Sequence, residues 1–182
     1  MDTETPIRAL VEQLAETLTL KALDRAGWLR HGIQRVESVA AHSWGVSWLV
    51  MQFLPDDLDQ GRALAYATLH DVAEIRVGDL TPADGVSSQD KARLESDAMR
   101  AICERLPRGD RLLGTWLRYE AQADPEARFV RQLDRLDMAL QALVYARQHD
   151  TDLVEFVDSA ATVVVHPELK AVLDTVRGLL PG

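Results

Sequence analysis

The chain has 182 residues, enough for one domain that buries most of its apolar surface. Its formal net charge is −9, so its surface repels polyphosphate backbones and disfavours a nucleic acid as a partner. A small phosphate ester is still an acceptable ligand where a metal ion and local arginines reverse the field.

Apolar residues recur at helical spacing along most of the chain, and turn residues separate the helical segments. Thr5-Pro6 predicts a cap with proline at the first helical position, Ser38 predicts an N-cap, and Asp124-Pro125 predicts the start of the longest helix. The predicted helices are, in chain order, 6–18, 38–54, 60–75, 88–106, 111–120, 125–148, 152–164 and 167–179.

Two glycine-containing segments, 24–35 and 78–87, are predicted to be ordered loops. No segment alternates with a period of two, so no sheet is expected, and no linker, repeat or low-complexity tract divides the chain. The sequence therefore predicts a single all-α domain, a helical bundle over residues 1–182.

Cysteine content and hydropathy bear on the compartment. Cys103 is the only cysteine, so no internal disulfide can form, and a buried thiol in a reducing cytosol is expected. There is no basic-then-apolar leader and no apolar run long enough to cross a bilayer. We therefore expect a cytoplasmic protein with no membrane partner.

The most informative motif is the dipeptide His70-Asp71, which lies in an apolar run that predicts a buried helix. A helix turns about 100° per residue, so the two side chains can converge on one point, and Glu74 shares the face of His70 one turn later. Ionisable groups on an apolar helix carry a desolvation cost unless they are paired or bind a metal. A solvated pair at a helix end is the alternative that this segment alone leaves open.

Two further segments carry matching side chains. His42 falls in the first turns of the helix that Ser38 caps, and Asp134 lies mid-helix among apolar residues. With His70 and Asp71 they supply two imidazoles and two carboxylates, a set that suits a divalent transition ion such as Mn, Fe, Co, Ni or Zn. An octahedral ion with four protein ligands would keep positions open for water and substrate.

This ordered set resembles the metal-ligand signature of the HD-domain phosphohydrolases, in which His42, His70, Asp71 and Asp134 would hold one metal ion. Local segments are similar to the 5'-deoxynucleotidase branch of that family, which removes phosphate from deoxyribonucleoside 5'-monophosphates. The resemblance covers roughly residues 18–148. It is carried by the segments Gly27–Arg30, Glu37–Ser43, His70–Glu74, Gly78–Pro82, Trp116–Glu120, Pro125–Val130 and Leu133–Leu136.

The resemblance also implies roles for residues near the ligands. Glu74 would be a general acid/base or would anchor a ligand, and Asp79 would contact the nucleoside sugar or the leaving oxygen. Arg30, in the loop before the first histidine, would contact the phosphate, with a solvated loop arginine as the alternative. The sequence is equally compatible with two roles for Trp28: lining a nucleoside pocket, or packing in the core.

Two positions depart from the family pattern. Ala41 stands where an acidic residue is usual, and Asp137 stands where glutamate is more usual. Neither is one of the four candidate ligands. Asp137, one turn after Asp134, fits a hydrogen bond that supports a ligand, or a surface ion pair with Arg131 or Arg135.

We therefore expect a metal-dependent phosphohydrolase with a small-molecule nucleotide as substrate. Trp44 and Trp48 share a helix face and fit packing or an oligomer contact, and a dimer is the expected assembly.

Two alternatives stay open at this point. A deoxynucleoside triphosphate triphosphohydrolase on the same scaffold would need more cationic contacts, and the loops offer few beyond Arg25, Arg35, Arg76 and Lys91. A catalytically silent module that binds a nucleotide or a partner helix is less favoured, because silence usually means lost ligands and all four candidates are present.

Overall fold

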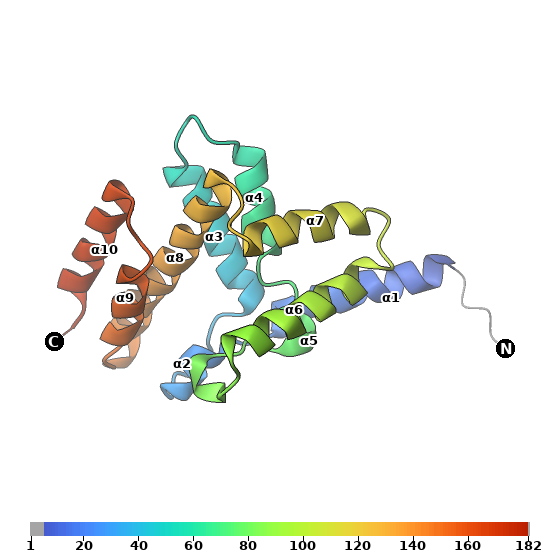
Figure 1. Cartoon of the computed structure of the whole chain (residues 1–182). Helices are drawn as coiled ribbons and strands as arrows, with labels where there is room; N and C mark the ends of the chain where they lie inside the picture. The colour runs from blue at the N-terminus through green and yellow to red at the C-terminus, as the bar shows by residue number, and fades with distance from the viewer. Residues whose placement is uncertain (1–5, 182) are drawn as a thin grey trace.

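The computed structural model describes residues 6–181, and over these residues every element is helical (Figure 1). The elements are α1 (Pro6–Leu18), η1 (Thr19–Ala22), α2 (Ala26–Arg30), α3 (Val39–Phe53), α4 (Gln60–Leu69), α5 (Glu74–Val77), η2 (Pro82–Asp84), α6 (Ser88–Cys103), α7 (Gly109–Glu120), α8 (Pro125–His149), α9 (Val154–Ala161) and α10 (Pro167–Leu179). The all-α prediction is thereby confirmed. Within residues 6–181 no helix is both long enough and apolar enough to cross a membrane.

The long helix α8 is the centre of the fold. Helices α3, α4, α9 and α10 all pack against it, and Figure 1 shows α9 and α10 on the opposite side of α8 from α4. Its buried residues recur at helical spacing on the faces that meet these neighbours: Val130, Leu133, Leu136, Ala139 and Leu143. Asp134 and Asp137 are half-buried among these apolar residues, so their carboxylates need specific partners.

Helices α6 and α7 form a smaller unit beside this core. They pack against each other, and α5 packs on α6. Met99 and Trp116 are buried there with Ala73 from the turn before α5. Because α7 packs on α4 and α6 packs on α5, this unit adjoins the turn between α4 and α5, where the His70-Asp71 motif lies.

Capping explains where several helices begin. The Ser38 side chain accepts a hydrogen bond from the Ala41 amide at 3.2 Å, as the predicted N-cap of α3. Asp124 caps α8 by accepting from the Ala127 amide at 2.9 Å, directly before Pro125. The predicted cap at Thr5-Pro6 involves Thr5, which lies outside the described residues.

The predicted single helix over 60–75 is wrong, because α4 ends at Leu69. In a continuous helix the His70 carbonyl would accept from the Glu74 amide. Here the Trp116 indole donates to that carbonyl at 3.1 Å, and the Glu74 amide donates to the Asp71 carbonyl at 3.0 Å. The tighter backbone bonds turn the chain over residues 70–73, so His70 and Asp71 lie at the end of a helix.

Other boundaries differ from expectation as well. Helix α6 ends at Cys103, whereas the predicted helix reaches residue 106, and the predicted loop 78–87 contains η2. The predicted loop 24–35 contains α2, and an isolated antiparallel bridge joins Asp24, at its start, to Ser38, the N-cap of α3. The helix predicted over 152–164 covers only Val154–Ala161, because the Thr162 amide donates to the Ser159 carbonyl in a tighter closing turn.

Asp124→Ala should lower the free energy of unfolding by about 2 to 3 kcal/mol, because the carboxylate is buried with three donors. Besides capping α8, it accepts from the Tyr66 hydroxyl at 2.6 Å and from Arg118 at 3.0 Å. Denaturant unfolding measures the loss. Asp152→Ala removes an exposed cap of the Val154 amide and should cost about 1 kcal/mol or less; equal losses would contradict the assignment.

Candidate metal centre and cavity

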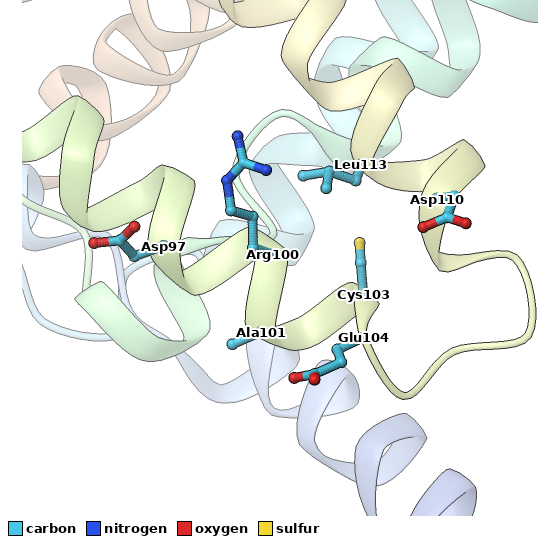
Figure 2. A pocket seen from close by; sticks show the side chains of 7 residues that line it. All are labelled: Asp97, Arg100, Ala101, Cys103, Glu104, Asp110 and Leu113. Carbon is cyan, nitrogen blue, oxygen red and sulfur yellow. The ribbon is translucent and has the colours of Figure 1, made fainter.

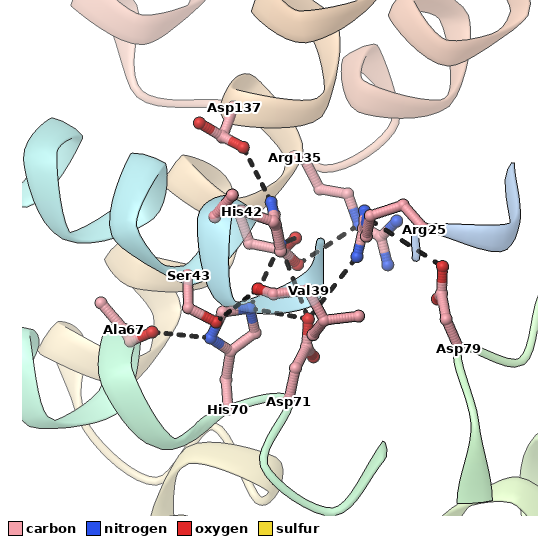
Figure 3. Close-up of polar contacts among 12 residues, drawn as sticks. Arg25, Val39, His42, Ser43, Ala67, His70, Asp71, Asp79, Arg135 and Asp137 are labelled. Atoms are coloured by element: carbon pink, nitrogen blue, oxygen red, sulfur yellow. Dashed lines mark hydrogen bonds and ion pairs between the residues drawn. The ribbon is translucent and has the colours of Figure 1, made fainter. Parts of the chain in front are cut away.

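The four predicted metal ligands come from three separate parts of the chain and lie close together. Figure 3 shows three of them, His42, His70 and Asp71, side by side. His42 lies on α3, His70 and Asp71 lie in the turn after α4, and Asp134 lies mid-way along α8. The Nε2 atom of His42 is 3.3 Å from His70 Nε2, 3.6 Å from Asp71 Oδ2 and 3.3 Å from Asp134 Oδ1. His42, His70 and Asp71 offer ligand atoms that all lie within 4.8 Å of one another, and Asp134 adjoins this trio through His42.

Hydrogen bonds on the other side of each imidazole fix its orientation. The Nδ1 atom of His70 is 2.9 Å from the Ala67 carbonyl oxygen, and the Nδ1 atom of His42 is 2.7 Å from Asp137 Oδ2. Both partners are pure acceptors, so both Nδ1 atoms carry the proton. In the neutral rings each Nε2 therefore presents a lone pair toward the other and toward the carboxylates.

This donor set fits a divalent transition ion. Two imidazole lone pairs and two carboxylates face one another, all from side chains that are buried or nearly buried. Ligand atoms 3.2 to 3.6 Å apart are spaced as expected for neighbouring ligands at about 2.1 Å from one ion. The chain therefore carries a His/Asp cluster that could bind a metal.

The carboxylates give the cluster a negative potential. Although burial alone would raise the pKa of Asp71 and of Asp134, the adjacent histidines hold both carboxyl groups well below their usual range. Burial and Arg25 act to lower the pKa of His42, but its hydrogen bonds with Asp134 and Asp137 raise it to about 10. The same carboxylates that raise the pKa of His42 would favour a bound cation, which would compete with a proton for the Nε2 atom.

Arg25 is a site residue that the sequence alone does not separate from the ordinary loop cations. Its guanidinium lies 3.6 Å from Asp71 and 4.0 Å from Asp79, with 14% of the side chain exposed. The bridge between Asp24 and Ser38 holds it there, because the Arg25 amide donates to the Glu37 carbonyl. Nothing in the pattern of residues 24–35 distinguishes Arg25 from Arg30, since the contact depends on that long-range pairing.

Glu74 begins α5 and lines the cavity beside Asp71. The residue is 4% exposed, and its Oε2 atom is buried with no hydrogen-bond partner in the described part of the chain. Burial first, and then the neighbouring carboxylates of Asp71 and Asp79, raise the pKa of Glu74 to about 10. An unpaired buried carboxyl beside a cation site is suited to proton transfer.

The other predicted residues line the same cavity at different depths. Asp79 accepts from the Ala26 amide at 2.7 Å, so one of its oxygens is already engaged. Arg30 lies nearer to solvent and forms an ion pair with Asp84. Trp28 is 1% exposed, and its indole donates to Glu37 at 2.9 Å, so it belongs mainly to the core behind the cavity wall.

The cavity has a volume of about 920 Å³ and opens over the His/Asp cluster. Its lining includes seven Asp or Glu residues and five Arg or Lys residues. A separate cavity of about 470 Å³ lies between α6 and α7 beside Cys103, and it contains none of the predicted site residues (Figure 2). The larger cavity is therefore the candidate site.

Comparisons with known proteins agree with this geometry. The sequence profile of the HD domain family matches residues 18–175. The 5'-deoxynucleotidase HDDC2 of Homo sapiens is 39% identical over 166 residues, which cover 89% of this chain and 81% of that protein. The 5'-deoxynucleotidase hdd1 of Schizosaccharomyces pombe is 36% identical over 165 residues, with 86% and 83% covered.

A solved structure agrees as well. The crystal structure of the PH0347 protein from Pyrococcus horikoshii OT3 superposes with a TM-score of 0.75 at 30% identity, covering 93% of this chain and 99% of that one. The fold, the ordered His/Asp cluster and these matches lead to one conclusion: the chain belongs to the HD domain family.

Proposed function

We propose that this protein is a metal-dependent phosphohydrolase that removes phosphate from deoxyribonucleoside 5'-monophosphates. The observation that carries the proposal is the convergence of His42, His70, Asp71 and Asp134 beneath a cavity large enough for a nucleotide. The curated relatives named 5'-deoxynucleotidase supply the substrate class.

The four ligands would hold one divalent ion, Mn, Fe, Co, Ni or Zn, which when bound would polarise the phosphoryl group and acidify water. Each ligand is oriented by the fold, so little reorganisation would accompany binding. Glu74 would accept or deliver the proton, since its carboxyl group has an unpaired oxygen at the cavity wall.

Arginines would hold the phosphate in a chain of net charge −9. Arg25 is deepest and adjoins Asp71, while Arg30 lies at the rim, where exchanging Asp84 for a phosphate costs little desolvation. Asp79 would keep one oxygen for the sugar or the leaving group while the other holds the Ala26 amide. Trp28 would shape the nucleoside side of the cavity from behind.

A triphosphate fits this cavity less well. Acidic residues outnumber basic ones along its wall, and four of its five cations already form ion pairs. The pairs are Arg25 with Asp71, Arg30 with Asp84, Lys91 with Glu95, and Arg135 with Asp134. A triphosphate would bring more negative charge than these cations can balance. We therefore favour a monophosphate over the triphosphohydrolase alternative, and an enzyme over a silent binding module, because all four ligands are present.

The deciding experiment is a screen of the purified protein with Mn, Co, Ni, Fe or Zn against nucleoside mono-, di- and triphosphates. Release of inorganic phosphate from deoxyribonucleoside 5'-monophosphates is the expected result. Release of tripolyphosphate from triphosphates would favour the alternative enzyme. No turnover with any of the metals would favour a binding module.

Arg30→Ala should raise KM for the best monophosphate and lower kcat/KM by about 10-fold, because a charge-assisted contact to phosphate is lost. Metal content and melting temperature should not change, since the side chain is about one-third exposed. Arg8→Ala, which removes an exposed arginine of α1, is the matched control. Kinetics equal to wild type would identify Arg30 as an ordinary surface residue and leave the phosphate to Arg25.

We propose that the protein forms a dimer through the exposed face of α3. Trp44 and Trp48 are 69% and 54% exposed with stacked rings, and Met51 beside them is 53% exposed, so packing within the chain does not explain them. Residues Val39–Phe53 include no Asp, Glu, Lys or Arg, so two copies with net charge −9 could meet there without like-charge contacts. Light scattering should give a dimer for the wild type and a monomer for Trp44→Lys; a wild-type monomer would refute the proposal.

A further inference from the structure

A close approach between α3 and α8 involves a glycine. Gly45 lies one turn after His42, and a Cβ atom built on it would be 2.1 Å from Oδ1 and 2.9 Å from Cγ of Asp137. Real Cβ atoms do not approach other atoms this closely, so the carboxylate occupies space that only a glycine leaves free. The same carboxylate accepts the hydrogen bond from His42 Nδ1 at 2.7 Å through its other oxygen.

The two histidines of the cluster are therefore oriented by different means. His70 is held by the Ala67 carbonyl oxygen, which belongs to the backbone of α4. His42 depends on a side chain from another helix. Glu37 also lies near His42, but one of its oxygens accepts from the Trp28 indole, and Asp137 is the hydrogen-bond partner of His42 Nδ1 within residues 6–181.

We infer that Asp137 is a positioning residue that aims His42 Nε2 at the metal, and that Gly45 is required because it leaves room for the Asp137 carboxylate. A carboxylate partner fixes the tautomer and makes the imidazole a better ligand than a neutral acceptor would. The inference rests on the metal site proposed above. It assigns to Gly45 a role that its residue type does not indicate, since glycine is normally a poor choice within a helix.

The test measures metal affinity on metal-free protein without a nucleotide, by competing Co²⁺ or Zn²⁺ against a chelating indicator. Asp137→Ala should weaken affinity by about 10- to 100-fold, the range for loss of such a partner. Gly45→Ala should weaken it by about 10-fold while leaving the melting temperature of the metal-free protein unchanged or higher, because alanine favours the helix. A merely structural glycine would give loss of stability instead.

The double variant and a matched glycine control show whether Gly45 acts through Asp137. If it does, then Gly45→Ala should have no further effect in the Asp137→Ala background. Gly114→Ala on α7, where an added Cβ meets nothing within 4 Å, should leave affinity at the wild-type value. Wild-type affinity in Asp137→Ala, or additive losses in the double variant, would overturn the inference while leaving the metal site intact. A wild-type protein that binds no metal would refute both.

Discussion

Asp71→Asn should abolish metal retention and lower turnover by about 1,000-fold or more. The substitution keeps the shape of the side chain but removes the charge that lies 3.2 Å from His70 Nε2 and 3.6 Å from His42 Nε2. An amide is a much weaker ligand for a transition ion than a carboxylate. Metal analysis after gel filtration measures retention. Thermal unfolding gives a second readout, because an ion that binds only the folded wild type raises its melting temperature as the ion concentration rises.

Asp56→Asn is the matched control for this prediction, because Asp56 is exposed in the turn between α3 and α4. It should keep wild-type metal content, turnover and metal-dependent stabilisation. Full activity of Asp71→Asn in metal-stripped buffer would refute the ligand assignment, and so would an undiminished rise of its melting temperature with metal.

The His/Asp cluster of candidate ligands could be picked out from the sequence because each of its members stands out locally. His42, His70, Asp71 and Asp134 are ionisable residues within apolar segments, and three different predicted helices carry them, with His70 and Asp71 on the same one. The long helix α8 and the all-α class followed from capping residues and helical spacing. Capping residues and helical spacing are local patterns, so they can be read from a single sequence.

Other features depend on contacts between distant segments and were not predictable. The end of α4 at Leu69 depends on the Trp116 indole, which donates to a carbonyl 46 residues earlier in the chain. The placement of Arg25 depends on the pairing of Asp24 with Ser38. For Asp137 the sequence allowed either a hydrogen bond that supports a ligand or a surface ion pair. The structure shows the hydrogen bond, because the Asp137 carboxylate on α8 contacts His42 on α3.

A substitution of Glu74 can distinguish metal binding from proton transfer. The set of four proposed ligands does not require Glu74, yet its carboxyl group lies at the cavity wall with one oxygen that has no hydrogen-bond partner in residues 6–181. Glu74→Gln preserves the shape of the side chain and removes its ability to exchange a proton. The variant should therefore keep its metal and its KM but lose turnover by about 100-fold or more.

Metal content and kinetics measured on one preparation decide this prediction, with Glu168→Gln on the exposed first turn of α10 as the matched control. If Glu74→Gln loses the metal, Glu74 is a ligand or holds a ligand in place. If it keeps both metal and turnover, proton transfer belongs to another group, and Asp79 is the next carboxylate along the same wall. Retained metal with lost turnover is the single outcome expected of a proton-transfer group, because such a group acts on the reacting atoms and leaves ground-state binding of the nucleotide unchanged.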